Sequence, residues 1–384
     1  MRSMTVEGWR FIAHSYAMVN QWQLLAFLRR SDIALKIVDL PYYRERWAPQ
    51  QGLFKPADEK LLRSLVIAAP GENADVTLRI SAPFDISPSS SPGTAVFGTS
   101  ETQVLRPEQF LDPNAFDKLL RAGPSSEICV VTPSHWSAEA FYKVGFHPQQ
   151  VLIVPHGVDS DTFRPMPGVR EAVRSKLAIS DDDFVFLSVG SMTGNKGMDL
   201  LLRAFAVVST NFPQARLVLK GLDELYRSNT YLHESMQMLS TQDRERIAGR
   251  ISYLGGSFSN EAMAKLYHVA DAYVSPYRAE GFNIPVLEAA ASGLPIICTR
   301  GGPTDGFVTD AFARRIDSHK AQMVLQDREA FRLEPSLEHL IALMEAMIED
   351  RSWREQAIAA GPSHVHANYN WDRVVEILAQ KLFA

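Results

Sequence analysis

The second half of the chain alternates short apolar runs with stretches of helical periodicity. The apolar runs predict buried strands at 184–189, 216–219, 251–254, 272–275 and 295–299. Apolar residues spaced three and four positions apart predict helices at 198–208, 260–269 and 285–291. Strands that alternate with helices are typical of a parallel sheet with helices on both faces, so an α/β fold is expected.

The first half of the chain is less regular. Strands are expected at 8–12, 35–39, 96–99 and 129–132, a helix at 22–28, and a helix N-cap at Ser134. The stretch 83–93 is rich in proline and serine, which indicates a loop.

The chain has 384 residues, enough for two domains of ordinary size. Its clearest linker is the run Arg164-Pro165-Met166-Pro167-Gly168, which suits a semi-rigid hinge. We therefore expect an N-terminal domain at 1–165 and a C-terminal domain at 169–367. The last helix, expected at 371–382, carries an apolar stripe on one face, and Asn370 is its candidate cap.

Composition limits the classes of partner and compartment. The formal net charge of −5 gives no bulk attraction to nucleic acid, so no nucleic-acid partner is expected. Cys129 and Cys298 lie in apolar runs and are expected to be small buried hydrophobes, not a disulfide. No signal peptide is visible and no apolar run approaches about 18 residues, so a cytoplasmic protein is expected. Peripheral contact with the cytoplasmic face of a membrane stays open.

The most informative pattern lies at 278–293. Two carboxylates, Glu280 and Glu288, stand between an expected strand and the end of an expected helix, which starts with a proline and stops at Gly293. The free N–H groups and the dipole at such a helix start favour an anion such as a phosphate. Carboxylates accept hydrogen bonds from hydroxyl groups, so the two glutamates suit polyols on either side of a diphosphate.

The segment Glu280-Gly281-Phe282-Asn283-Ile284-Pro285-Val286-Leu287-Glu288-Ala289 resembles the glutamate-x7-glutamate signature of retaining glycosyltransferase family 4, which has the GT-B fold. The resemblance implies two Rossmann-like domains that face a central cleft. It also implies that the C-terminal helix, 368–384, crosses back to the N-terminal domain.

The same resemblance assigns roles in the donor site. Glu280 is expected to contact the hydroxyls of the donor sugar, and Glu288 the ribose of the nucleotide. The diphosphate is expected in the loop that contains Phe282, on the backbone N–H groups of Asn283 and Ile284.

A second loop, 188–197, also follows an expected strand and precedes a helix. Gly190 lets the backbone approach a ligand, Ser191 follows it, and Lys196 places a positive charge near the helix start. Lys196 and the residues after it are similar to the family segment Lys-Gly-x-Asp-x-Leu-Leu-x-Ala-Phe, whose lysine contacts the diphosphate.

The family often has an arginine shortly before that lysine, and this chain has Ser191 and Asn195 there. Two interpretations stay open. Either Arg278 or another arginine substitutes, or the diphosphate is held by Lys196 and the backbone alone. Base contacts in the family are largely made by the backbone, which places the base near Leu254.

The N-terminal domain matches the family more loosely. The family's catalytic-site histidine is absent from the loop after the strand expected at 96–99. Glu101 is the candidate to occupy its place, and an ordinary surface glutamate is the alternative. His14 and Ser15 follow the first expected strand, where the family's first loop meets the diphosphate and the acceptor.

The resemblance implies a retaining hexosyltransferase. It would move a sugar from a nucleotide-diphosphate sugar to a hydroxyl of a carbohydrate or lipid-linked acceptor, in polysaccharide, glycolipid or glycoconjugate synthesis. No cofactor and no metal is expected, because the chain has no Asp-x-Asp pair at the usual metal–nucleotide position and no Cys/His cluster with zinc spacing. Three alternatives stay open: a nucleotide-sugar epimerase, a phosphorylase of the glycogen type, and a catalytically weak subunit that binds nucleotide sugars.

Overall fold

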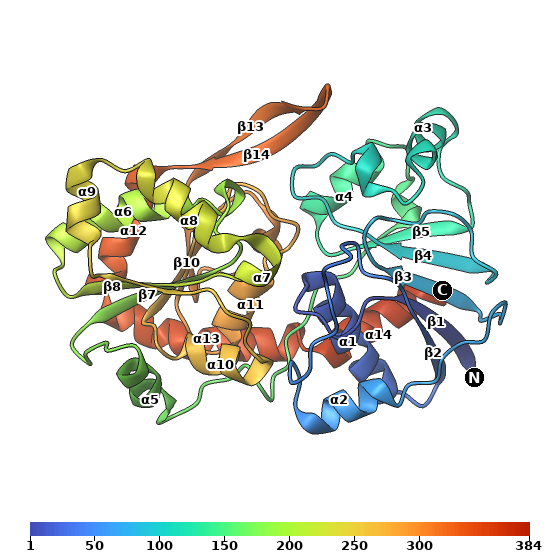
Figure 1. Cartoon of the computed structure of the whole chain (residues 1–384), viewed down its shortest axis with the longest axis horizontal. Helices are drawn as coiled ribbons and strands as arrows, with labels where there is room; N and C mark the ends of the chain where they lie inside the picture. The colour runs from blue at the N-terminus through green and yellow to red at the C-terminus, as the bar shows by residue number, and fades with distance from the viewer. The chain divides into compact units, whose positions relative to one another are not determined.

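Residues 1–384 are all described by the computed structural model, and they form two units (Figure 1). The first unit comprises Met1–Gly157, Met323–Ala330 and Tyr369–Ala384, and the second comprises Val158–Gln322 and Phe331–Asn368. The sequence placed the domain boundary at 165–169. In the structure, these residues lie inside the second unit, because the chain before them already packs there through the ring of Phe163 against Tyr267.

The first unit contains a six-stranded parallel sheet in the order β2-β1-β3-β4-β5-β6. The strands are β1 (Arg2–Gly8), β2 (Ile33–Asp39), β3 (Val76–Ile80), β4 (Gly93–Phe97), β5 (Ile128–Thr132) and β6 (Val151–Ile153). The helices are α1 (Ser15–Leu28), α2 (Pro56–Arg63), α3 (Pro113–Ala122), α4 (His135–Tyr142) and α14 (Trp371–Leu382). Helix α14 packs against α1, so the predicted return of the last helix to the N-terminal domain is confirmed (Figure 1).

The second unit also contains a six-stranded parallel sheet, in the order β12-β11-β10-β7-β8-β9. The strands are β7 (Phe184–Val189), β8 (Ala215–Lys220), β9 (Ile251–Leu254), β10 (Ala272–Ser275), β11 (Ile296–Thr299) and β12 (Ala313–Ile316). The helices are α5 (Val169–Lys176), α6 (Met198–Asn211), α7 (Asp223–Tyr226), α8 (Ser228–Gln237), α9 (Thr241–Ile247), α10 (Asn260–Tyr267), α11 (Ile284–Ala291), α12 (Leu337–Glu349) and α13 (Arg351–Asn368).

Helices cover both faces of this second sheet. In Figure 1, α6, α8, α9 and α12 lie on one face, and α5, α10, α11 and α13 lie on the other. The expected strands and helices of this half are therefore confirmed, with ends that differ by at most a few residues. Each unit is a Rossmann-like α/β structure, as the alternating pattern predicts.

Several elements differ from the prediction. No element was expected where β3, β12, α2, α3, α12 and α13 lie, and α1 begins at Ser15 instead of residue 22. The first strand is Arg2–Gly8 and not 8–12, because the chain turns after Gly8 and Phe11 adopts a φ of 60°. The apolar residues there are buried in a loop, which an apolar pattern alone cannot distinguish from a strand. The chain also forms a hairpin of β13 (Ser318–Leu325) and β14 (Arg328–Pro335), which the apolar pattern does not predict. Its turn residues, Gln326 and Asp327, have positive φ but lack the usual Asn-Gly pattern.

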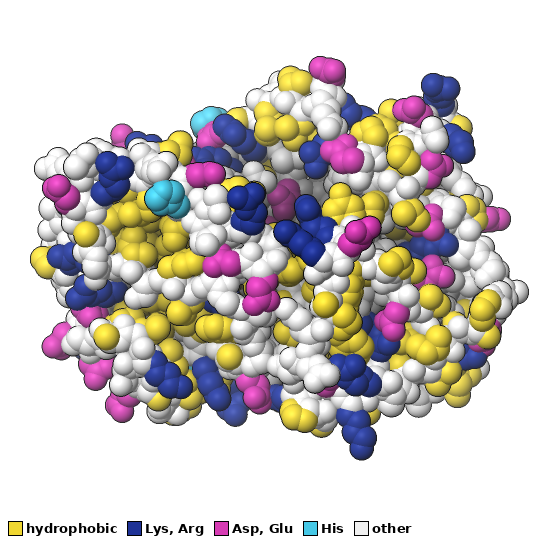
Figure 2. All heavy atoms as spheres, viewed as in Figure 1, with side chains coloured by type: hydrophobic (Ala, Val, Ile, Leu, Met, Phe, Trp, Pro, Cys, Tyr) yellow, Lys and Arg dark blue, Asp and Glu magenta, His cyan; other side chains and the backbone are white.

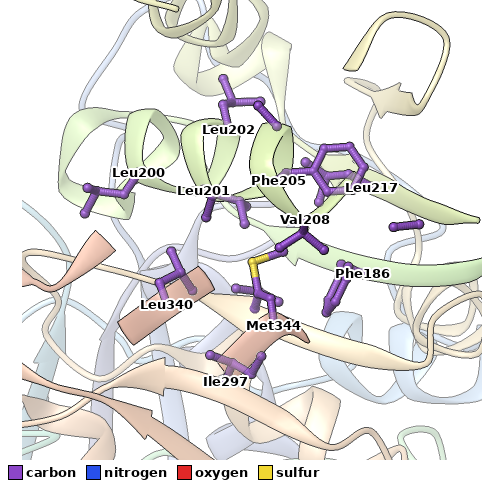
Figure 3. Packing of buried hydrophobic residues seen from close by; sticks show 14 of the residues in the cluster. Phe186, Leu200, Leu201, Leu202, Phe205, Val208, Leu217, Ile297, Leu340 and Met344 are labelled. Atoms are coloured by element: carbon purple, nitrogen blue, oxygen red, sulfur yellow. The ribbon is translucent and has the colours of Figure 1, made fainter. Parts of the chain in front are cut away.

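A cluster of buried apolar side chains holds α6 against the sheet and α12. Figure 3 shows Leu201 and Phe205 of α6 near Phe186 of β7, Ile297 of β11 and Met344 of α12, and all five are fully buried. Burial of apolar surface contributes about 25 cal/mol per Å². This packing fixes where α6 begins, which is the end of the loop that carries Lys196.

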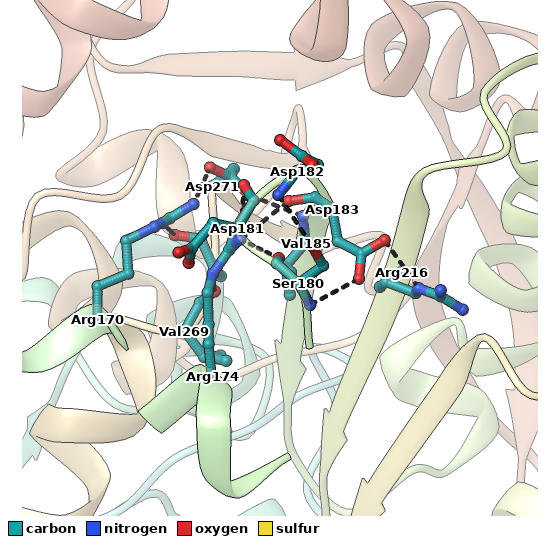
Figure 4. A network of polar contacts seen from close by, with 11 residues as sticks. Arg170, Arg174, Ser180, Asp181, Asp182, Asp183, Val185, Arg216, Val269 and Asp271 are labelled. Carbon is teal, nitrogen blue, oxygen red and sulfur yellow. Dashed lines mark hydrogen bonds and ion pairs between the residues drawn. The ribbon is translucent and has the colours of Figure 1, made fainter. Parts of the chain in front are cut away.

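A network of ion pairs and hydrogen bonds lies at the amino-terminal edge of the second unit's sheet, opposite the edge where α6 begins (Figure 4). Arg174 of α5 is only 1% exposed and donates to Asp271 Oδ2 at 2.7 Å. Asp271 also accepts from Arg170 at 2.6 Å and from the amide of Val185 at 2.8 Å. Arg174 donates further to the carbonyls of Val269, Ser180 and Asp183. The network thus ties α5 to the starts of β7 and β10.

The surface carries both signs of charge. Figure 2 shows acidic and basic side chains interspersed over the face in view. No helix is both long enough and apolar enough to cross a bilayer. Both cysteines are free thiols, and burial raises the pKa of Cys129 to about 11 and that of Cys298 to about 12.

Candidate functional site

The loop between β10 and α11 presents the start of a helix at the carboxyl edge of the second sheet. Asn283 caps α11 with φ 78° and ψ 63°, and its side-chain amide donates to Ser275 Oγ at 3.0 Å. This bond ties the turn to the end of β10. Pro285 lies in the first turn of α11, where it costs no hydrogen bond. The first N–H groups of the helix, from Ile284 on, have no intrahelical acceptor and suit an anion.

The loop between β7 and α6 packs directly against that loop. Gly197 has a φ of 68°, and a Cβ atom there would collide with the carbonyl oxygen of Pro276. Gly190 lies beside the side chain of Lys196. A Cβ atom added at Gly190 would lie 3.4 Å from Lys196 Cε. Ser191 Oγ lies 3.3 Å from Thr193 Oγ1. Glycine at 197 therefore permits the close approach of the two loops.

The approach of the two loops brings Lys196 and Glu280 into contact. The Lys196 ammonium donates to Glu280 Oε1. The side chain of Lys196 is 23% exposed and that of Glu280 is 6% exposed. Two residues that the sequence analysis chose from separate motifs thus form one ion pair at the carboxyl edge of the sheet.

Glu288 lies on α11, the helix that begins at the end of the loop that carries Glu280. Tyr267 donates its hydroxyl to Glu288 Oε2 at 2.7 Å. Burial raises the pKa of Glu288 from 4.5 to about 7, and the hydrogen bond from Tyr267 acts in the opposite direction. Burial also raises the pKa of Tyr273, and the charges of Glu280 and Glu288 both add to this shift. Both carboxylates therefore act electrostatically on the same buried tyrosine of β10.

The predicted base region lies at the ends of β8 and β9. Leu254 accepts at its carbonyl from the amide of Gly221, at 2.9 Å, so the two strands' exits are joined. Lys220 is 4% exposed and donates to the carbonyls of Gly221 at 2.5 Å and Gly256 at 2.7 Å. Its ammonium lies 4.7 Å from the ring centre of Phe258. Burial lowers the pKa of Lys220 to about 8.

Two of the predicted donor-site residues have other partners. The guanidinium of Arg278 forms ion pairs with Asp199 and Glu334. The ring of Phe282 is buried and stacks on Phe307, with centroids 4.7 Å apart. The Phe282 side chain therefore packs, and a ligand would meet this part of the loop at its backbone.

The first unit holds the remaining predicted residues. His14 caps α1 and accepts at Nδ1 from the amide of Tyr16 at 3.3 Å. Burial lowers the pKa of His14 to about 4, so its ring is neutral near pH 7. Ser15 and Glu101 are exposed, and the carbonyl of Glu101 accepts from Trp136 Nε1 at 2.8 Å.

Tyr16 places His14 and Glu101 in one neighbourhood of the first unit. The ring of His14 lies 5.8 Å from that of Tyr16. Burial raises the pKa of Tyr16, and the charge of Glu101 makes a smaller contribution in the same direction. The predicted acceptor-side residues and Glu101 thus share this neighbourhood.

Several contributing residues escaped the sequence analysis: Asp199, Lys220, Tyr267 and Tyr273. The two tyrosines lie within the helix expected at 260–269 and the strand expected at 272–275, where the apolar pattern indicates no polar role. A signal existed for Lys220, because a lysine at the end of an apolar strand is unusual unless its charge has partners. No group of three or more His, Cys, Asp or Glu side chains is placed to hold a metal ion together.

Comparisons of sequence identify relatives of the chain among glycosyltransferases. A family model described as glycosyl transferases group 1 matches residues 169–362. The chain is 26% identical over 270 residues to the lipopolysaccharide 1,2-N-acetylglucosaminetransferase of Salmonella typhimurium, a match that covers 70% of this chain and 65% of that protein. It is 28% identical over 234 residues to the D-inositol 3-phosphate glycosyltransferase of Geodermatophilus obscurus, with 61% and 47% covered. The chain thus spans about half to two thirds of these relatives.

Comparisons of structure show the fold. Anabaena HepE in complex with UDP-glucose has a TM-score of 0.69 and 15% identity, with 100% of both chains covered. WaaG, a glycosyltransferase involved in lipopolysaccharide biosynthesis, has a TM-score of 0.65 and 16% identity, with 100% of this chain and 99% of WaaG covered. The predicted GT-B fold is confirmed by these similarities.

Proposed function

Because the chain belongs to the family of glycosyl transferases group 1, we propose that it is a retaining, metal-independent glycosyltransferase of family 4. It transfers a sugar from a nucleoside-diphosphate sugar to an acceptor hydroxyl. The observation that carries the proposal is the contact between Lys196 and Glu280 beside the start of α11, with Glu288 on the same helix. This centre combines a cation, a helix N-terminus and two carboxylates, which are the groups that a sugar nucleotide needs.

Each group has one task in the proposed reaction. The diphosphate lies at the start of α11 and forms an ion pair with the Lys196 ammonium, which replaces the contact of Lys196 with Glu280. Glu280 then accepts hydrogen bonds from the donor sugar, and Glu288 accepts from the ribose. Bonds from hydroxyls to a carboxylate are charge-assisted, which makes them stronger than neutral ones.

The transfer itself breaks the bond between the anomeric carbon and the β-phosphate oxygen. The acceptor oxygen bonds to that carbon on the same face, and its proton passes to the departing phosphate oxygen, so the reaction needs no protein base. Lys196 and the helix dipole meet the leaving-group charge. Glu280 favours the positive charge that develops on the sugar ring.

The printed activities of the relatives support the type of substrate. They name lipopolysaccharide and inositol 3-phosphate, both of which carry hydroxyl acceptors. HepE has been crystallised with UDP-glucose. We propose a carbohydrate or lipid-linked acceptor on this basis.

The test has two stages. A thermal-shift screen of nucleotide sugars first identifies the donor, since a ligand at 100 times its dissociation constant stabilises by about 2.7 kcal/mol. Turnover of that donor with sugar or glycolipid acceptors is then followed by NMR, which reports the configuration at the new glycosidic bond. We expect the configuration of the donor to be retained, with activity unchanged by EDTA.

Each other result has its own meaning. An inverted product would refute retention, and loss of activity in EDTA that added Mg²⁺ restores would refute metal independence. An epimerised donor without an acceptor would indicate an epimerase. Tight donor binding with neither transfer nor slow hydrolysis would indicate a binding subunit.

A further inference from the structure

Arg278 lies two positions before Glu280, and its side chain is 14% exposed. Its guanidinium donates from Nη1 and Nη2 to the two carboxylate oxygens of Asp199, at 2.6 and 2.8 Å. It also donates from Nη1 to the carbonyl of Gly194 at 3.0 Å and from Nε to Glu334 Oε2 at 3.2 Å. Since a guanidinium has five N–H donors in a fixed plane, these contacts use nearly all of its capacity.

The charges of this cluster are matched within the protein. The hydrogen bond to Asp199 raises the pKa of Arg278, although burial acts against it. Burial is the largest influence and tends to raise the pKa of Asp199. The hydrogen bonds and charge of Arg278, together with backbone amides at the start of α6, outweigh it, so the net shift of this pKa is downward. An arginine that binds a diphosphate needs donors to spare. The donors of Arg278 are instead hydrogen-bonded to two carboxylates. This argues against the interpretation that Arg278 replaces the family's phosphate-binding arginine.

The backbone at Arg278 joins the same neighbours. The amides of Arg278 and Ala279 both donate to the carbonyl of Asn195, at 2.7 and 3.2 Å. The carbonyl of Arg278 accepts from the amide of Leu333 in β14, at 2.7 Å. One residue therefore links three segments: the loop that carries Lys196, the loop that carries Glu280, and the β13–β14 hairpin.

We propose that Arg278 is a positioning residue of the donor site. It acts through Asp199, in the first turn of α6, and through its own backbone to hold Lys196 and Glu280 at a fixed separation. The kinetic consequence rests on the proposed function, whereas the effect on the two loops does not. A shift of about 1 Å in a reacting group can cost about a hundredfold in rate, so such a clamp is kinetically important.

The hairpin is the third anchor of the clamp. Glu334 accepts from Arg278 through one oxygen, and its other oxygen forms an ion pair with Arg332 at 2.5 Å. Glu334 thus lies between two arginines at the base of β14. The hairpin is in this way connected to the loop of Glu280 by a side chain as well as by the backbone.

Arg278→Lys is the main test, because lysine keeps the charge but loses the planar two-point contact. Hydrogen–deuterium exchange of the protein without substrate should become faster in 190–199 and 278–284 together. With the donor found by the thermal-shift screen, kcat should fall about 10- to 100-fold while the dissociation constant of the nucleoside diphosphate changes less than about threefold.

Arg314→Lys is the matched control. Arg314 is in the same unit, pairs with Asp350 at 2.5 Å and stacks on Trp353, away from the donor loops. The substitution removes the guanidinium of an ion pair elsewhere in the unit and should leave both the exchange of the two loops and the rate unchanged. An equal effect of both substitutions would mean that Arg278 only stabilises the fold, and would overturn the proposal.

A double-mutant cycle tests whether Arg278 acts through Asp199. Asp199→Asn should reproduce the faster exchange, and Arg278→Lys combined with Asp199→Asn should add little to either single change. If Arg278→Lys does not fold, Asp199→Asn and the milder Glu334→Gln give the same measurements.

Two further results would refute the proposal. Unchanged loop exchange in every variant would show that Arg278 positions nothing. A loss of about tenfold in diphosphate affinity with unchanged kcat would make Arg278 a direct phosphate ligand. If the parent protein binds no nucleoside diphosphate at all, the proposed function fails. The hydrogen–deuterium exchange experiment would then still test whether Arg278 positions the two loops.

Discussion

The ammonium of Lys196 contacts the carboxylate of Glu280 across 84 residues of sequence. In the ligand-free protein each charge compensates the other, which lowers the cost of burying Glu280. A bound diphosphate must compete with Glu280 for the ammonium of Lys196. The donor sugar must then form hydrogen bonds with the carboxylate of Glu280. The pair therefore links phosphate binding to the release of the carboxylate that the sugar needs.

Glu280→Gln should separate these two roles. Glutamine keeps the shape but removes the charge that opposes phosphate binding and favours a cationic transition state. Free nucleoside diphosphate should bind equally well or more tightly, while turnover should fall about a hundredfold, or roughly 2.7 kcal/mol. Calorimetry and steady-state kinetics measure the two effects. Normal turnover with a raised Michaelis constant would reduce Glu280 to a ground-state hydroxyl contact.

Lys196→Ala should weaken the binding of ligands according to their phosphates. A charge-assisted hydrogen bond contributes roughly 1.5–3 kcal/mol, so the affinity for a nucleoside diphosphate should fall by about one to two orders of magnitude. The same nucleoside without phosphates is the control and should bind alike to mutant and parent in calorimetry. Equal losses for both ligands would point to a disturbed loop instead of a lost phosphate contact.

Glu288 should make donor binding depend on pH. Its folded pKa of about 7 means that the carboxylate that accepts ribose hydroxyls is half protonated near neutrality. Below that pH the dissociation constant should rise by up to about tenfold per unit, because binding must first remove the proton. A nucleotide sugar is the right probe, since its diester diphosphate does not titrate in this range. Glu288→Gln should bind more weakly than the parent above pH 7, with a flat pH profile.

The same residue should cost stability at alkaline pH. The pKa of Glu288 is raised on folding from 4.5 to about 7, so the folded state holds a proton that the unfolded chain has released between these values. Stability therefore falls as pH rises from 4.5 to 7 and then stays lowered. Glu288→Gln should melt at a higher temperature than the parent at about pH 8, with the advantage gone below about pH 4.5. An advantage independent of pH would exclude this ionisation as the cause.

Arg174 and Arg170 offer a matched pair for stability. Both bind Asp271, but Arg174 is 1% exposed and Arg170 is 41% exposed. Arg174→Ala leaves buried carbonyls and part of the Asp271 charge unpaired and should cost about 3–5 kcal/mol in urea unfolding. Arg170→Ala should cost less than about 1 kcal/mol, as for an exposed pair. Similar losses would mean that burial does not control the strength of this network. Nucleotide affinity of the folded protein should change in neither variant, because the network lies at the opposite edge of the sheet.

The local pattern of apolar and polar residues was enough to predict many of the strands and helices of the second unit. Phe184–Val189, Ile251–Leu254 and Ala272–Ser275 were predicted with the ends that the structure has, because buried parallel strands are continuous apolar runs. The first unit was predicted less well. Strands β1, β2 and β3 carry charged side chains among the apolar ones, which obscures the apolar run. The buried loop after β1 also has the apolar pattern of a strand.

The sequence by itself determined the α/β class, the strand–loop–helix units, and the residues with the chemistry for a sugar nucleotide, Lys196, Glu280 and Glu288. Only the tertiary structure decided how these residues are combined. In the fold, Lys196 pairs with Glu280, and Tyr267 donates a hydrogen bond to Glu288. The guanidinium of Arg278 forms ion pairs with Asp199 and Glu334. The reason is that side-chain type and spacing report local backbone geometry, whereas pairing between loops depends on strand order and on close approaches such as that of Gly197 to Pro276.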